Sequence, residues 1–129
     1  MTSPINPHAT HLHVASENPK LAFGDLKPCA HYVPMNVMVQ VAEVMRGGAD
    51  KYGLKNWRRQ PIRASTYYDA MFRHMVQWFE GLEDQDAESQ QHHLAHVVCC
   101  AMLVLDSLER GILVDDRRDT EVLTQNNKD

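Results

Sequence analysis

Two segments with helical periodicity, joined by a short acidic tip, constrain the fold of this chain more than any other feature of the sequence. The first starts near Ser65 or Thr66, which are suitable N-caps, and ends around Glu83. The second runs from about Glu88 to Leu108, and a glycine follows it soon afterwards. Only about five residues connect the two segments, so we predict that they form antiparallel neighbouring helices.

The apolar positions predict which sides of these helices face the core. In the first helix the inward stripe is expected to consist of Tyr67, Met71, Met75, Trp78 and Leu82, widened by Phe72 and Phe79. In the second it is expected to consist of Leu94, Val97, Val98, Ala101, Leu105 and Leu108. An earlier helix should follow Pro34, with Asn36 as its N-cap, and should weaken at the Gly47–Gly48 pair. Residues 49–64 are expected to form a loop with at most one helical turn.

These elements predict an all-α chain that folds as one compact helical bundle. Its 129 residues favour a single domain, which can bury a core without disulfides. We expect residues 1–20, which contain three prolines, to form an extended or flexible arm. Residues 21–113 should form the domain, and residues 114–129 should form a charged tail.

Composition excludes several classes of protein. The formal net charge is −4, so there is no basic excess of the kind that binds nucleic acid. The longest apolar run, Val97 to Leu105, is far shorter than the roughly 20 residues that span a bilayer. The N-terminus lacks the apolar run of a signal peptide, and three cysteines without a CxxC motif are typical of reduced thiols. We therefore expect a cytoplasmic protein with no nucleic-acid or membrane partner.

Carboxylates and imidazoles gather around the acidic tip. The carboxylates are Glu80, Glu83 and Asp86, and the imidazoles are His92, His93 and His96. Counting away from the tip places His74 to Gln77 level with His93 to His96. Facing helices build metal sites in this way, and a mixed oxygen and nitrogen set suits Mn²⁺, Co²⁺ or Zn²⁺ as well as Mg²⁺. The same pattern also fits a solvated acidic helix end with exposed histidines.

A basic and aromatic loop, residues 51–63, is the second candidate for chemistry. Lys51 and Arg58 can bind phosphate oxygens, and Tyr52 or Trp57 can stack on a base. The alternative is a solvated loop in which Trp57 fills the core. Farther along, Arg73 and His74 have a similar ambiguity, because an i,i+4 ion pair between Asp69 and Arg73, and a histidine at the edge of the core, would explain them equally well.

Three strings, GADKYGLKNW (48–57), YYDAMFRHMVQW (67–78) and GLEDQDAESQQHHLAHVVCC (81–100), carry a family resemblance. Over roughly residues 24–108 the chain resembles phage dATP/dGTP diphosphohydrolases, compact relatives of the MazG-like all-α nucleoside triphosphate pyrophosphohydrolases. The resemblance implies a homodimer or homotetramer with the site between helices and across subunits. It also implies hydrolysis of dGTP or dATP between the α and β phosphates to a monophosphate and pyrophosphate. In that setting dGMP supplies phage synthesis of 2-aminoadenine nucleotides.

The superfamily pattern is ExxE on one helix and ExxD on the next, and this chain departs from it. Glu80xxGlu83 fits the first element, His93xxHis96 stands where the second falls, and Glu83xxAsp86 matches the second by letters at the tip. The hypothesis is that two or three Mg²⁺, Mn²⁺ or Co²⁺ ions are held by Glu80, Glu83, Asp86, His92, His93 and His96. Glu80 or Glu83 would orient or deprotonate the attacking water. The expected substrate-binding residues are Lys51, Tyr52, Asn56, Trp57, Arg58, Arg73 and His74.

Two other functions stay open at this point. One is a metal-dependent phosphohydrolase that releases triphosphate or phosphate, although no adjacent His-Asp pair occurs here. The other is a phage helical module that binds a nucleotide without turning it over.

Overall fold

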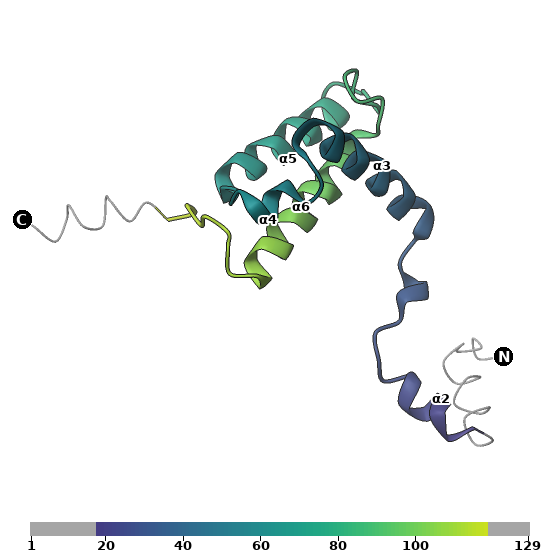
Figure 1. The fold of residues 1–129 in the computed structure, drawn as a ribbon. Coiled ribbons are helices and arrows are strands. Elements are labelled where there is room, and N and C mark those ends of the chain that lie inside the picture. The colour runs from purple at the N-terminus through teal and green to yellow at the C-terminus, as the bar shows by residue number, and fades with distance from the viewer. Residues whose placement is uncertain (1–17, 119–129) are drawn as a thin grey trace, which may run out of the picture. The chain divides into compact units, whose positions relative to one another are not determined.

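The computed structural model describes residues 18–118, and every regular element in that range is a helix (Figure 1). The elements are α2 (Pro19–Gly24), a short 3-10 helix η1 (Ala30–Tyr32), α3 (Met35–Tyr52), α4 (Asn56–Arg59), α5 (Ala64–Phe79) and α6 (His93–Glu109). The all-α prediction is confirmed. None of these helices combines the length and the apolar character needed to cross a membrane.

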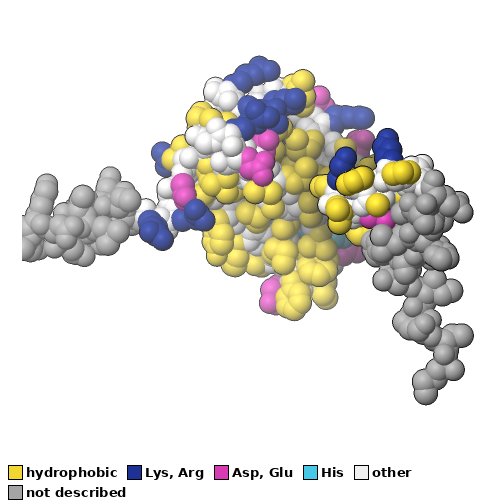
Figure 2. Space-filling model, turned by 90° about the horizontal axis from the view of Figure 1, so that it is seen from below, with side chains coloured by type: hydrophobic (Ala, Val, Ile, Leu, Met, Phe, Trp, Pro, Cys, Tyr) yellow, Lys and Arg dark blue, Asp and Glu magenta, His cyan; other side chains and the backbone are white. Residues whose placement is uncertain are grey.

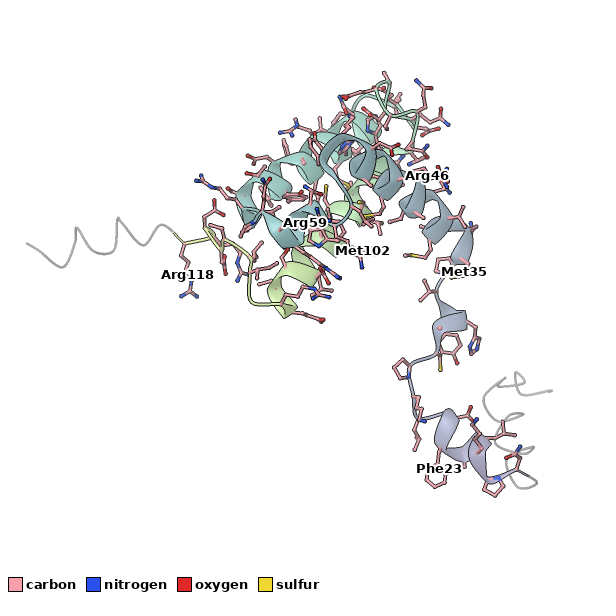
Figure 3. All side chains as sticks on the ribbon, in the orientation of Figure 1. Phe23, Met35, Arg46, Arg59, Met102 and Arg118 are labelled. Carbon is pink, nitrogen blue, oxygen red and sulfur yellow. The ribbon has the colours of Figure 1, made fainter. Side chains whose placement is uncertain are left out.

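The described part of the chain divides after Met35 into two units, residues 18–35 and residues 36–118. In the described part of the first unit, Asn18 caps α2 by accepting a hydrogen bond from the Lys20 amide (3.1 Å), and Pro19 occupies the first helical position. Phe23 projects from this helix and is exposed (Figure 3). Residues 1–17 of the expected extended arm lie outside the described range, but its last two residues belong to α2.

In the second unit α5 and α6 pack side by side along their lengths, as the short-connection argument predicts (Figure 1). The connection itself is longer than expected, because α5 ends at Phe79 and α6 begins only at His93. The ring of His92 caps α6, since its Nδ1 accepts a hydrogen bond from the Leu94 amide (3.0 Å). Glu83 and Asp86 therefore lie on a loop rather than on a helix.

Gly81 lets this loop turn tightly against the end of α5. Its amide donates to the Val76 carbonyl (3.1 Å), and the Glu83 amide donates to the Gln77 carbonyl (3.1 Å). A Cβ atom at residue 81 would lie 2.6 Å from the Gln77 oxygen, which is closer than real side chains approach. A glycine is therefore required where the chain leaves the helix.

The helix starts differ from the expected ones. Helix α3 begins at Met35, so Asn36 lies inside its first turn, and the helix continues through both glycines to Tyr52. Helix α5 begins at Ala64 without a side-chain cap from its own N-cap residue. A carboxylate far along the sequence accepts hydrogen bonds from its first turn instead. Both the amide of Ser65 (2.9 Å) and its hydroxyl donate to the Asp116 carboxylate.

The residues just before Asp116 are attached to the start of α5. Val114 donates its amide to the Ile62 carbonyl (2.9 Å) and accepts from the Ala64 amide (3.0 Å). The first residues of the expected charged tail are thus bound to the helical unit through backbone pairing. Residues 119–129 of that tail lie outside the described range.

The core of the second unit is small and centres on α3 and α6. Val41 from α3 packs with Ala95 and Cys99 from α6, and the Cys99 thiol lies 3.2 Å from the Met45 sulfur. Burial raises the pKa of Cys99 to about 11, so this thiol is unreactive at neutral pH.

The expected inward stripes need correction. On α5 and the loop after it, Phe72, Met75, Phe79 and Leu82 are exposed. On α6 the residues Ala101, Leu105 and Leu108 are exposed, while Ala95, Cys99 and Ser107 are buried. Helix α6 is apolar around most of its circumference, so periodicity alone could not identify its buried side.

A second contact joins α4 to α6. Asp106 accepts hydrogen bonds from the indole of Trp57 (2.8 Å) and from Arg58 at two atoms (2.9 and 3.0 Å). The side-chain hydrogen bonds from Arg58 and then Trp57 hold the pKa of Asp106 well below its usual range. The ionised carboxylate therefore stabilises the folded chain.

Replacing Val41 with Ala should lower the free energy of unfolding by about 2 kcal/mol, because it removes two fully buried methyl groups and leaves a small cavity. Val39→Ala on the same helix is the matched control, since Val39 is 60% exposed, and it should cost less than about 0.5 kcal/mol. Urea unfolding followed by circular dichroism measures both. Equal losses for the two variants would contradict this core.

Asp106→Asn should lower the stability most at neutral pH. Because the folded-state pKa of Asp106 lies below its unfolded value, its contribution is present above the ordinary aspartate pKa of about 3.9 and is lost as the pH falls. The difference in unfolding free energy from the unmodified chain should therefore shrink in acid. Asp69→Asn, at an exposed position of α5, is the control. A pH-independent deficit for Asp106→Asn would contradict this account.

Candidate functional site

A polar pocket of about 300 Å³ lies where α3, α5, the 80–92 loop and α6 meet. Its walls are formed by the end of α3, the C-terminal half of α5, the loop and the first turn of α6. The lining residues are Lys51, Arg73, His74, Gln77, Asp86, Glu88, Ser89 and His96. Cationic, anionic and imidazole groups therefore converge on one cavity.

Three imidazoles form the inner wall of the site. Nδ1 of His74 lies 2.8 Å from Nδ1 of His93, so one of these nitrogens carries a hydrogen and the other accepts it. The rings of His74 and His96 stack with centroids 4.3 Å apart. Burial is the main cause that lowers the pKa of His74, and the neighbouring histidines lower it further. Burial likewise lowers the pKa of His96 against the opposing effect of Asp86.

His93 is the most unusual member of this group. It is completely buried, and its Nε2 has no hydrogen-bond partner among the described residues. The Glu83 carboxylate lies 3.7 Å from this nitrogen. A buried nitrogen without a partner costs free energy, and a cation bound to it would remove that cost.

Asp86 supplies the carboxylate at the mouth of the imidazole group. Burial alone would raise its pKa, but the hydrogen bonds from Ser89, together with His96 and His74, outweigh burial and the pKa is lowered. His74, Asp86 and His93 each offer one ligand atom, and these atoms lie within 4.8 Å of one another. Neutral imidazoles and an ionised carboxylate fit a divalent metal, and this mixed donor set suits Mn²⁺, Co²⁺ or Zn²⁺ better than a purely oxygen site would.

Lys51 and Arg73 supply positive charge to the same pocket. Lys51 donates to Glu88 (2.6 Å), and this hydrogen bond raises the pKa of the lysine. Both partners are largely exposed, so the pair contributes little to stability. An anionic ligand can therefore compete with Glu88 for the ammonium group.

Residues 17–117 match the family model described as dATP/dGTP diphosphohydrolase, N-terminal. The chain belongs to this family. It is also 35% identical over 79 residues to the dATP/dGTP diphosphohydrolase of Salmonella phage PMBT28, an alignment that covers 61% of this chain and 26% of the relative. The chain thus spans about a quarter of the length of that relative. No solved structure matches it.

In this diphosphohydrolase-family chain, many of the expected site residues lie together. The pocket gathers Lys51, Arg73, His74, Asp86 and His96, while His93 and Glu83 lie beside its histidines. The expected alignment of His74 with the His93–His96 turn is confirmed by the contacts of its ring with both histidines.

The other expected residues lie elsewhere. Trp57 and Arg58 are bound to Asp106, and Trp57 is buried, which matches the core-filling alternative for this residue. His92 caps α6, and its Nε2 lies 4.0 Å from Asp84. The remaining three, Tyr52, Asn56 and Glu80, do not line the pocket.

Three pocket residues were missed by the sequence argument: Gln77, Glu88 and Ser89. Helical spacing could have found Gln77, because it lies three residues after His74 on the same helix. The other two depend on how the 80–92 loop folds, which carries no periodic signal.

Proposed function

We propose that this chain holds the catalytic site of a metal-dependent dATP/dGTP diphosphohydrolase that releases a deoxynucleoside monophosphate and pyrophosphate. The observation that carries the proposal is that Asp86 and His74 line the same pocket as the cationic side chains of Lys51 and Arg73. The family and the name of the phage relative support the choice of substrate. With dGTP the product is dGMP, which we propose feeds phage synthesis of 2-aminoadenine nucleotides.

His74, Asp86 and His93 would hold a divalent cation, Mn²⁺, Co²⁺ or Mg²⁺, with Glu83 beside them. When bound, such an ion neutralises phosphate charge and lowers the pKa of a water molecule. The oxygen of the attacking water forms a bond to the α-phosphorus, and the bond from that phosphorus to the bridging oxygen breaks. Glu83, a partly exposed carboxylate, is the base that takes the water proton.

Lys51 and Arg73 would bind the β and γ phosphates. Arg73 can contact two phosphate oxygens at once, whereas Lys51 acts as a point charge that leaves Glu88 for the substrate. Negative charge builds up on the departing pyrophosphate, and fixed positive charge stabilises it there. Gln77 can add a hydrogen bond from the same face of α5.

We also propose that the chain forms a homodimer or homotetramer. Exposed apolar residues recur along α5 at Tyr68, Phe72, Val76 and Phe79, and along α6 at Met102, Leu105 and Leu108. Figure 2 shows hydrophobic side chains gathered over a broad area of the helical unit. Helices that are apolar on a second face are typically buried by a partner, and large exposed apolar patches are typical of protein interfaces.

The reaction is tested by incubating the purified chain with each dNTP and Mn²⁺ or Mg²⁺, followed by ion-exchange analysis of the products. We expect dGMP or dAMP with pyrophosphate, and none with EDTA. Asp86→Asn should lower turnover at least about 100-fold, because even residues that only support a metal ligand cost 10- to 100-fold. Asp69→Asn, the same change at an exposed position of α5, should keep normal turnover.

Three outcomes would contradict the proposal. Release of triphosphate or phosphate would indicate a different phosphohydrolase. Nucleotide binding without turnover would indicate a binding module. Normal turnover in Asp86→Asn would mean that the reaction takes place elsewhere.

The oligomer is tested by light scattering after size-exclusion chromatography. Phe72→Glu places a charge on the exposed apolar face of α5, so we expect it to lower the measured mass toward that of one chain. Thr66→Glu, at an exposed polar position on the same helix, should leave the mass unchanged. A monomeric unmodified chain would rule out self-association.

A further inference from the structure

The loop before α6 contains a tight turn closed by two backbone hydrogen bonds. The Asp86 amide donates to the Gln91 carbonyl (2.8 Å), and the Gln90 amide donates to the Asp86 carbonyl (2.8 Å). Gln90 adopts a left-handed conformation (φ 63°) to complete the turn. Ser89 lies within this turn, and it lines the pocket.

Ser89 makes three polar contacts inside the turn. Its amide donates to Asp86 Oδ2 (3.0 Å), and its hydroxyl oxygen accepts from the Gln91 amide (3.2 Å). The same hydroxyl oxygen lies 2.7 Å from Nε2 of His96. Accepting from Gln91 uses a lone pair and leaves the hydroxyl hydrogen free to be donated. Two acceptors lie near this hydrogen: Nε2 of His96, 2.7 Å from the hydroxyl oxygen, and the Asp86 carboxylate, which already accepts from the Ser89 amide and whose pKa the Ser89 side chain also lowers.

We propose that Ser89 is a positioning residue of this site: its hydroxyl donates to Nε2 of His96 and holds that ring as the Nδ1–H tautomer, while its amide holds Asp86. The hydrogen bonds of Ser89 do not depend on the proposed function, whereas its effect on metal binding does. His96 is then a supporting residue, because the side chains whose ligand atoms lie within 4.8 Å of one another are those of His74, Asp86 and His93. That differs from the sequence hypothesis, which placed His96 among the ligands.

Ring stacking transmits the orientation of His96 to His74, one of the imidazoles that would hold the cation. His96 lies flat against His74, with 6° between the ring planes, so a fixed His96 limits the rotation of His74. Nδ1 of His74 is thereby kept near His93. Ser89 thus acts on two of the three candidate ligands, on Asp86 directly and on His74 through His96. Groups that orient ligands in this way are an ordinary part of metal sites.

The tautomer is tested on the full chain without metal, at a pH above the ordinary histidine pKa, by two-dimensional ¹⁵N NMR of the imidazoles. In the unmodified chain we expect His96 to carry its proton on Nδ1. Ser89→Ala keeps the amide but removes the hydroxyl, so His96 should shift toward the Nε2–H form. Ser89→Thr should restore the original pattern. Ser65→Ala, which removes a hydroxyl at the other end of α5, should leave His96 unchanged.

Metal binding is the second readout, followed by titration with Mn²⁺ alone. Ser89→Ala should weaken Mn²⁺ binding about 10- to 100-fold, and Ser89→Thr should recover most of that loss. An Nε2–H tautomer of His96 in the unmodified chain would overturn the proposal without depending on the folding of any variant. Unchanged Mn²⁺ affinity in Ser89→Ala would overturn the positioning role. Neither readout involves dNTP turnover, so a chain that hydrolyses no dNTP would contradict the proposed function alone.

Discussion

The hydrogen bond from the Leu94 amide to the ring of His92 determines where α6 begins, and the site depends on that position. A helix that began one turn earlier would carry Ser89 and Gln91 inside it. The turn that presents Asp86 to the pocket would then not exist. Within the first turn of α6, the ring of His93 is buried against His74 and the ring of His96 stacks on the same side chain. A local choice of backbone conformation thus assembles groups from two helices and a loop.

The sequence predicted the helical pair and the alignment of His74 with the first turn of α6, because periodicity and a short connection are local signals. It could not predict the buried side of α6, which is apolar nearly all round. The sequence also could not decide whether the basic loop binds a phosphate group or another part of the protein. Trp57 and Arg58 would look the same in a phosphate site, yet Asp106, almost 50 positions later, binds both. The role of Ser89 depends on a turn that two backbone hydrogen bonds close, and residue spacing does not predict such a turn.

The helical unit buries few large apolar side chains among its described residues, while it buries His93 and Ser107 completely. Completely buried polar groups reduce the stability that a small core can supply. The second apolar faces of α5 and α6 would offset this if another copy covered them. A polar site thus gives the chain a reason to assemble, because burial of its exposed apolar faces would restore the stability that the buried polar groups cost.

Gly81, at the edge of the pocket, is a position where the backbone does not tolerate a side chain. It has no side chain and carries no charge. Even so, a methyl group at this position would collide with the backbone carbonyl of Gln77, a residue whose side chain lines the pocket. The chain could relieve the collision only by moving the segment that brings in Glu83 and Asp86. Selection on catalysis would therefore act on this backbone position as strongly as on a reacting group, although an inspection of side chains alone would overlook it.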